Sequence, residues 1–335
     1  QAQTETKSFL ACPTCHSRAV VTHMKQTFLL LILLFCYPFC IAQNITAFTE
    51  SNSDLAEDKL WGISVDKNGN KWIGTSEFGL QKFDGEKWTT FDKNNSEIKG
   101  GFISPIFTDS KGNLWLSYSK PDGLVKFDGE KWTTFNAKEI KLSRISIIDI
   151  VEDKDGNIYF GGGSGITKYN GNIWEKIPLP IKGVTVRALD VSNDGELAVG
   201  HNSGLLIKAN GEWKSYTDKS SELQLSVVRA VKYVDNKLYI GYGGGSGNGG
   251  FSILKKNKWT HYNKSNSNIP NHMVRVIKED SNGVLWMATN DGVIRFEKGK
   301  IKTIYLREKI NSILDIEIEN DKVWVATFFG LFKIE

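Results

Sequence analysis

The sequence has 335 residues, of which 40% are hydrophobic and 11% are aromatic, with 32 glycines and 7 prolines. This composition supports a large folded core and excludes a disordered or collagen-like chain. The formal net charge is +4, and residues 1–42 carry half of it, so the rest of the chain is close to neutral. A nearly neutral chain offers no electrostatic basis for binding nucleic acid.

Residues 24–42 have the pattern of a secretory signal. Met24 and Lys25 form a short positive start, an unbroken apolar run covers 28–35, and small residues precede a cleavage site after Ala42. The apolar run is too short to span a membrane. We therefore expect a periplasmic or extracellular protein that does not span the membrane. Residues 1–23 precede the natural start at Met24, and we expect them to be translated upstream sequence.

The cysteines bear on both anchoring and metal binding, and all of them precede residue 43: Cys12, Cys15, Cys36 and Cys40. A lipid anchor is the alternative to cleavage, but Cys36 and Cys40 each follow a phenylalanine, where a lipoprotein signal has a small residue. Cys12 and Cys15 with His16 supply only part of a zinc site, because structural zinc needs four ligands. We expect neither a metal nor another cofactor.

A repeat dominates the rest of the chain. The nonapeptide FDGEKWTTF occurs at 83–91 and again at 127–135. Around it lies a unit of an aliphatic strand, an Asp-x-x-Gly turn, an aromatic strand and two further strands. The aliphatic position recurs in seven units, at Ile63, Ile106, Ile150, Leu189, Val231, Ile277 and Ile316. Seven units of four short strands predict an all-β fold over 43–335, a seven-bladed β-propeller with four antiparallel strands per blade.

The two ends of the repeat region complement each other. The seventh unit stops after its third strand, at 330–335, while residues 45–53 (ITAFTESNS) are similar to the fourth strand of the first unit at 88–96 (WTTFDKNNS). We therefore expect the N-terminal strand to complete the last blade. This closure would leave no unpaired inner edge.

The unit resembles the two-component regulator propeller repeat. Residues 66–75 with Gly79-Leu80 and Phe83-Asp84-Gly85 carry the resemblance, as do 280–289 with Gly292, and it extends over 44–335. The resemblance implies the propeller fold. It also implies a link to the periplasmic sensor regions of hybrid histidine kinases, which often respond to glycans. This chain differs in having one propeller with neither a transmembrane helix nor a kinase, so we expect only the binding or sensing half of that plan.

Three arginines are the first candidate ligand contacts. Arg187, Arg229 and Arg275 begin the inner strand of blades 4, 5 and 6, in the frames TVRAL, VVRAV and MVRVI. The corresponding positions of the other blades are Trp61, Ser104, Ile148 and Leu314. Three guanidinium groups near the rim of the central channel would suit carboxylate or sulfate groups. The alternative is that each arginine stem only covers apolar surface at a blade junction.

The loops between second and third strands are the other candidates. They vary in length and sequence, whereas the strands do not, and they share a face with the links between blades. Binding residues concentrate in such loops, although the variation is also what ordinary surface loops show. The glycine-rich stretch 241–250 lacks the lysine and the helix of a phosphate-binding loop. The candidate ligand contacts in these loops are Phe78, Tyr118, His201, Tyr242, Asn290 and Phe328.

No catalytic residues can be assigned. The chain has no Gly-x-Ser-x-Gly motif, and His201, His261 and His272 lie in different blades. We predict a monomeric, exported, non-catalytic module that binds a carbohydrate such as an anionic glycan fragment, another small molecule, or a cell-envelope protein. The alternative is a propeller-fold lyase or hydrolase acting on a polysaccharide or a small cyclic substrate, like the streptogramin lyases. An enzyme should show a histidine or tyrosine converging with an acid at the channel mouth.

Overall fold

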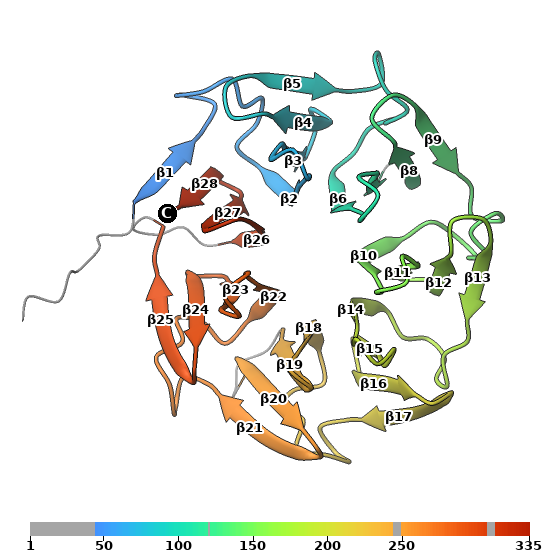
Figure 1. Ribbon diagram of the computed structural model, residues 1–335, viewed down its shortest axis with the longest axis vertical. Helices are drawn as coiled ribbons and strands as arrows, with labels where there is room; N and C mark the ends of the chain where they lie inside the picture. Colours follow the sequence, from blue (N-terminus) through green and yellow to red (C-terminus); the bar gives the residue numbers. More distant parts are fainter. Residues whose placement is uncertain (1–43, 120, 244–248, 307–311) are drawn as a thin grey trace, which may run out of the picture. The chain divides into compact units, whose positions relative to one another are not determined.

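The computed structural model describes residues 44–119, 121–243, 249–306 and 312–335. Within these ranges the chain forms strands β1 to β28, which make seven four-stranded antiparallel sheets arranged around a central axis (Figure 1). The predicted seven-bladed β-propeller is therefore confirmed. The expected signal segment and the upstream residues 1–23 lie outside the described residues.

The first four blades run from the inner strand outward in chain order. Blade 1 comprises β2 (Leu60–Val65), β3 (Lys71–Thr75), β4 (Leu80–Phe83) and β5 (Trp88–Phe91). Blade 2 comprises β6 (Ile103–Thr108), β7 (Leu114–Tyr118), β8 (Gly123–Phe127) and β9 (Trp132–Phe135). Blade 3 comprises β10 (Ile147–Glu152), β11 (Ile158–Gly162), β12 (Gly165–Tyr169) and β13 (Trp174–Ile177). Blade 4 comprises β14 (Val186–Val191), β15 (Leu197–His201), β16 (Gly204–Ala209) and β17 (Glu212–Tyr216).

The last three blades include the closure of the ring. Blade 5 comprises β18 (Val228–Val234), β19 (Lys237–Tyr242), β20 (Phe251–Lys255) and β21 (Lys258–Tyr262). Blade 6 comprises β22 (Val274–Glu279), β23 (Leu285–Thr289), β24 (Val293–Glu297) and β25 (Lys300–Ile304). Blade 7 comprises β26 (Ile313–Glu319), β27 (Lys322–Thr327), β28 (Gly330–Ile334) and the N-terminal β1 (Ile45–Phe48). None of the described segments forms a helix long and apolar enough to cross a membrane.

The N-terminal strand closes the ring as predicted. β1 pairs antiparallel with β28, with Ile45 opposite Ile334 and Phe48 opposite Leu331. The Phe48 ring lies 5.7 Å from the ring of Trp324 in blade 7 and 5.3 Å from that of Phe83 in blade 1. One residue of β1 therefore contributes to the packing of both the last and the first blade, and aromatic pairs of this kind stabilise a core beyond the area that they bury.

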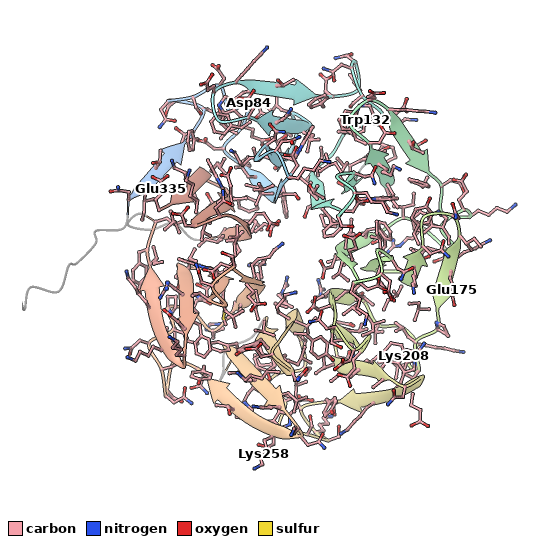
Figure 2. All side chains as sticks on the ribbon, viewed as in Figure 1. Asp84, Trp132, Glu175, Lys208, Lys258 and Glu335 are labelled. Atoms are coloured by element: carbon pink, nitrogen blue, oxygen red, sulfur yellow. The ribbon has the colours of Figure 1, made fainter. Side chains whose placement is uncertain are left out.

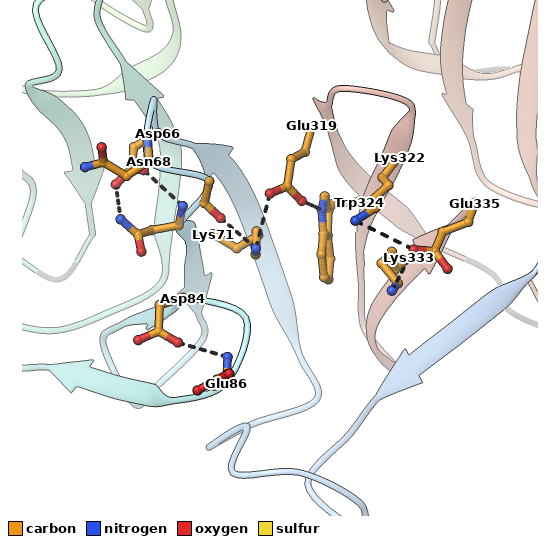
Figure 3. A network of polar contacts seen from close by, with 12 residues as sticks. Asp66, Asn68, Lys71, Asp84, Glu86, Glu319, Lys322, Trp324, Lys333 and Glu335 are labelled. Atoms are coloured by element: carbon orange, nitrogen blue, oxygen red, sulfur yellow. Dashed lines mark hydrogen bonds and ion pairs between the residues drawn. The ribbon is translucent and has the colours of Figure 1, made fainter.

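Polar contacts reinforce the same junction (Figure 3). Glu319 accepts a hydrogen bond from Trp324 Nε1 at 2.8 Å, and it forms an ion pair with the buried Lys71 of blade 1 at 3.5 Å. Lys71 Nζ also lies 4.9 Å from the Trp324 ring centroid. A buried ammonium needs such partners, because burying an isolated charge is costly.

The turn aspartate of the repeat has a structural role in several blades. In blade 1, Asp66 accepts hydrogen bonds from the backbone of Asn68 at 2.9 Å and from Trp72 Nε1 at 2.9 Å. Its counterparts bind the equivalent indoles in blades 2 and 6, Asp109 with Trp115 and Asp280 with Trp286, each at 2.9 Å. In these blades the repeat motif ties the hairpin turn to the aromatic core, which explains why it predicts the fold and says little about a ligand.

Candidate ligand-binding site

A cavity of about 600 Å³ occupies the centre of the ring. Each blade contributes residues of its inner strand to the lining. Figure 2 shows side chains of the inner strands directed toward the central opening, whereas Glu175 and Lys258 lie on the outer strands β13 and β21. The interior of the ring is therefore the enclosed surface on which side chains from all seven blades can meet one ligand.

A β-bulge shapes the start of each inner strand. In blade 4 the pairing of β14 with β15 shifts between Val186 and Ala188, so that Arg187 is the extra residue. The same shift makes Arg229 and Arg275 the extra residues of β18 and β22, and Trp61 that of β2. A bulge bends the strand and re-aims a side chain. The regular alternation of side chains between the two faces of the strand is thus broken at the three arginines.

All three arginines line the central cavity. Burial lowers the pKa of Arg229, and the positive charges of Arg275 and Arg187 lower it further. Burial also lowers the pKa of Arg275. Arg229 therefore lies near enough to Arg187 and Arg275 to be affected by their charges, and all three side chains share one cavity.

The arginines are poorly satisfied by the protein itself. Arg275 Nε donates to Asn290 Oδ1 at 3.1 Å. The Nε atoms of Arg187 and Arg229 are buried, and neither has a hydrogen-bond partner among the described residues. Within those residues, no acidic side chain forms an ion pair with any of the three arginines. A buried donor without a partner costs about 1–3 kcal/mol. The Nε atoms of Arg187 and Arg229 therefore lack the acceptors that buried donors need.

Gly243 makes room for one of these arginines. A Cβ at this position would overlap Cγ, Cδ and Nε of Arg229. Any other residue here would push the Arg229 side chain aside. Gly243, in the glycine-rich stretch 241–250, therefore leaves the space that the Arg229 side chain occupies.

A second set of ionisable residues on the inner strands lines the same cavity: Asp149, Asp190, Lys232, Lys278 and Asp315. The two lysines of this set form ion pairs. Lys232 Nζ lies 3.1 Å from Asp190 Oδ1, and Lys278 Nζ lies 2.8 Å from Glu317 Oε2. We call these five residues and Glu317 the paired layer.

The carboxylates of the paired layer join neighbouring blades. Asp149 of blade 3 accepts a hydrogen bond from Leu189 N of blade 4 at 2.7 Å. Asp315 of blade 7 accepts one from Ile63 N of blade 1 at 3.1 Å. Burial raises the pKa of both Asp149 and Asp315 to about 7, although these hydrogen bonds act in the opposite direction.

Of the six loop candidates, Tyr118 lines the central cavity, whereas Phe78, His201, Tyr242, Asn290 and Phe328 do not. Phe78 is 53% exposed, Phe328 packs edge-on against Trp61 with ring centroids 5.0 Å apart, and Asn290 holds Arg275. Tyr118 lines the cavity wall but is only 6% exposed, so it offers little ring face.

His201 and Tyr242 correct the sequence interpretation. They are 1% and 0% exposed, so neither can stack on or directly bind a ligand in this conformation. Tyr242 donates to Ser252 Oγ at 2.8 Å, and His201 Nδ1 accepts from Ser203 N at 3.1 Å. Each is the last residue of a second strand, a position that the neighbouring blade covers. Thr289 and Thr327 hold the same position in blades 6 and 7 and are also 0% exposed.

Two aromatic residues that line the cavity, Trp61 and Phe102, were not among the candidate ligand contacts predicted from the sequence. The rings of Trp61 and Phe102 stack with centroids 4.7 Å apart, and both residues line the cavity. Trp61 Nε1 donates to Ser76 Oγ at 2.8 Å, which fixes the ring. The repeat could have indicated Trp61 as a cavity residue, because Trp61 occupies the bulge position that holds arginine in blades 4 to 6.

One constellation resembles a catalytic set but cannot act as one. Ser252 Oγ lies 2.7 Å from His261 Nδ1, and His261 Nε2 lies 3.9 Å from Glu222 Oε2. A nucleophile, a base and an acid have this order. However, Ser252 is 0% exposed within the blade, so a substrate has no access to its hydroxyl. In the described part of the chain, no group of three or more histidine, cysteine, aspartate or glutamate side chains is placed to hold a metal ion.

Comparison with known proteins supports the identification of the repeat. Residues 268–291 match the profile of the two component regulator propeller, so the chain carries this repeat, as its sequence predicted. No curated protein matches the chain in sequence.

Solved structures show the same fold. The extracellular domain of a putative hybrid two component system from B. thetaiotaomicron is 18% identical with a TM-score of 0.70, over 87% of this chain and 41% of that one. A catalytically inactive histidine-to-alanine variant of virginiamycin B lyase from Staphylococcus aureus, with quinupristin, is 16% identical with a TM-score of 0.71, over 87% of this chain and 99% of that one. At these identities the similarity concerns the fold alone.

Proposed function

We propose that this propeller is a binding module that holds an anionic group of its ligand on Arg187, Arg229 and Arg275 at the mouth of the central cavity. One observation carries the proposal: two buried guanidinium Nε atoms have no partner among the described residues, in a cluster whose charges repel one another. A carboxylate or sulfate bound in the cavity beside the three arginines that line it would offset these positive charges. Charge-assisted hydrogen bonds between such groups are worth about 1.5–3 kcal/mol each.

The proposal includes export and a sensing role. The signal-like pattern of residues 24–42 supports a periplasmic or extracellular location. The repeat match and the fold similarity to an extracellular domain of a two-component system support a role in detecting a ligand outside the cytoplasm. An anionic glycan fragment is the ligand that we favour, and a cell-envelope protein would receive the signal.

Binding is favoured over a lyase or hydrolase activity. The similarity to virginiamycin B lyase concerns the fold, and the inactive form of that enzyme replaces a histidine. No histidine of the described chain lines the central cavity here. The cavity presents cations and aromatic rings, and the carboxyl groups of Asp149, Asp190 and Asp315 that line it accept hydrogen bonds from neighbouring blades.

The test is a triple substitution, Arg187→Gln, Arg229→Gln and Arg275→Gln, with binding of trigalacturonate measured by calorimetry at low and high salt. We expect the parent to bind more weakly as salt rises, because partly exposed charges are screened over about 10 Å at 0.1 M. The variant should lose at least about tenfold in affinity. Its free energy of unfolding should change by less than about 1 kcal/mol, since removing like charges offsets lost packing.

The matched control carries Lys87→Gln, Lys131→Gln and Lys258→Gln, which remove the same net charge at exposed positions of the outer strands and turns. It should bind like the parent. Parental affinity of the arginine variant would overturn the proposal. A large loss of stability in that variant, with binding unchanged, would show that the arginines act only in packing.

A further inference from the structure

We propose that the ring carries, beside the mouth of the cavity, a docking surface for a partner protein that presents apolar side chains surrounded by lysines or arginines. This inference rests on the proposed function for the need of a protein that receives the signal, and it adds where and how that protein binds. It starts from three exposed aromatic residues, which we call the aromatic patch: Phe78, Phe102 and Phe329. In the described part of the chain they make up most of the large hydrophobic side chains that are exposed.

Hydrogen bonds join two of the loops that carry the patch. Phe329 lies between β27 and β28 of blade 7, and Phe78 lies between β3 and β4 of the neighbouring blade 1 (Figure 1). Gly330 N donates to a backbone oxygen of the link 57–59 at 2.9 Å, and Ser76 N donates to another oxygen of this link at 3.2 Å. The two phenylalanines therefore belong to loops that a single link connects.

Trp61 connects Phe102 to the same surface. The Trp61 ring stacks on the Phe102 ring with centroids 4.7 Å apart, and the Phe328 ring packs edge-on against Trp61 at 5.0 Å. Trp61 Nε1 donates to Ser76 Oγ, which belongs to the loop of Phe78. Packed rings and hydrogen bonds thus hold the patch in place. Exposed apolar patches and aromatic side chains are typical of protein interfaces.

The aromatic patch has an acidic rim. The segment 49–59, which connects blade 7 to blade 1, has one basic residue, Lys59, and four acidic residues: Glu50, Asp54, Glu57 and Asp58. Asp54 is exposed, and so is Glu77, the neighbour of Phe78. Within the described residues, no acidic side chain of this rim forms an ion pair. The rim therefore carries unpaired negative charge.

The charge of the rim decides between the possible occupants of the patch. A second copy of the chain that docked through the same patch would bring two acidic rims together, and an anionic lipid surface would also be repelled. A protein surface with an apolar centre and a rim of lysines or arginines complements both the rings and the charge. The three arginines of blades 4 to 6 would repel such a partner, so we expect it to dock over blades 7, 1 and 2.

The experiment uses two synthetic peptides as probes. One consists of leucine and lysine, and its helix places leucine on one face and lysine on the other. The second has glutamate in place of every lysine. Fluorescence anisotropy measures the binding of each labelled peptide to the parent, Phe78→Ser and Phe329→Ser. Ile173→Ser is the matched control, because Ile173 is 65% exposed, in the turn between β12 and β13, while Phe78 and Phe329 are 53% and 48% exposed.

We expect the leucine–lysine peptide to bind the parent, more weakly as salt rises, and the leucine–glutamate peptide not to bind. Phe78→Ser and Phe329→Ser should each weaken binding of the leucine–lysine peptide at least about fivefold, whereas Ile173→Ser should match the parent. Urea unfolding checks that the variants keep their fold.

A second set of variants tests the acidic rim. The double variant Asp54→Asn, Glu77→Gln should weaken binding of the leucine–lysine peptide about twofold to threefold, because exposed charges contribute little each. The matched control is Glu86→Gln, Glu130→Gln, which removes the same charge at exposed turns of blades 1 and 2 and should bind like the parent.

Several outcomes would overturn the inference. Equal binding of the leucine–lysine peptide to the parent and to both phenylalanine variants would show that the patch is not a docking surface. Equal binding of the two peptides to the parent would rule out a basic partner. A dimer in sedimentation that Phe329→Ser dissociates would assign the patch to a second copy. Binding of phosphatidylcholine vesicles that Phe329→Ser abolishes would assign it to a lipid surface.

This inference and the proposed function fail separately. The triple arginine-to-glutamine variant should bind the leucine–lysine peptide at least as tightly as the parent, because it removes repulsive charges. Phe329→Ser should bind trigalacturonate like the parent, since Phe329 does not line the cavity. If the arginine variant loses trigalacturonate while peptide binding ignores the patch, the anion site stands and the docking surface is wrong.

Discussion

The central cavity contains two sets of charged residues that lie on the same strands, and their surroundings differ. Arg187 precedes Asp190 by three positions in β14, and Arg229 precedes Lys232 by three in β18. Asp190 and Lys232 are paired at 3.1 Å, whereas the two arginines keep buried donors without partners among the described residues. Charges that the protein satisfies itself hold blades together. The charges of the three arginines form no ion pair with an acidic side chain of the described residues, and these are the residues that we propose for ligand binding.

The bulge is what separates the two sets. Beyond the bulge the inner strand pairs regularly, with Asp190 opposite Ala198 and Lys232 opposite Tyr239, and its side chains reach those of the neighbouring blade. At the bulge itself the strand gains an unpaired residue, whose side chain is free to differ from blade to blade. The residue at this position can therefore change without disturbing the packing of the blades.

The largest effect should come from breaking the paired layer. Asp190→Ala removes the partner of Lys232 Nζ and the acceptor of Tyr233 N, which Asp190 Oδ2 contacts at 2.6 Å. Loss of one partner from a buried pair costs about 3–5 kcal/mol, and we expect a loss in this range in urea unfolding. Asp190→Asn keeps one acceptor and should lose less. If Asp190→Ala were as stable as the arginine variant, the two sets of charges would not differ as we argue.

A second effect of the paired layer concerns pH. The folded pKa of Asp149 is about 7 because burial raises it, against 3.8 as its ordinary value, so the folded protein keeps a proton that the unfolded chain releases. The free energy of unfolding should therefore fall as pH rises from about 4 to about 7, by at most about 1.4 kcal/mol per pH unit for this group, and then level off.

The variant Asp149→Asn cannot titrate, so its decline in the free energy of unfolding over this range should be shallower than that of the parent. The measurement is urea unfolding at a series of pH values. Asp84→Asn is the control, because hydrogen bonds from the backbone of Lys87 and Glu86 lower the pKa of Asp84, and its titration falls below the range tested. Equal slopes for the parent and Asp149→Asn would contradict the assignment.

The fold was predictable because its sequence signals are core residues. The turn aspartate and the indole that it binds recur together, as Asp66 with Trp72 and Asp109 with Trp115, so the period of the sequence is the period of the packing. The closing strand was predictable for the same reason, since residues 45–53 keep the pattern of a fourth strand.

The site was only partly predictable. The arginines were found because they hold one position in three successive blades. His201 and Tyr242 were misjudged, because burial at the end of a second strand depends on the neighbouring blade and not on the local sequence. The stacking of Trp61 on Phe102 joins blade 1 to the following link, and no periodic signal marks such a contact.

The smallest change tests whether ligand binding depends on the position of the Arg229 side chain. In Gly243→Ala the new Cβ would overlap the Arg229 side chain, which is flexible, so the side chain should move and the backbone should stay. We expect the affinity for trigalacturonate to fall about tenfold, with a small change in the free energy of unfolding. Gly62→Ala is the matched control, because a Cβ there meets its neighbours at ordinary distances of 3.6 Å and more. Parental affinity of Gly243→Ala would mean that the ligand does not use Arg229 where the structure places it. A loss of stability as large as that of Asp190→Ala would mean that Gly243 serves the backbone rather than the arginine.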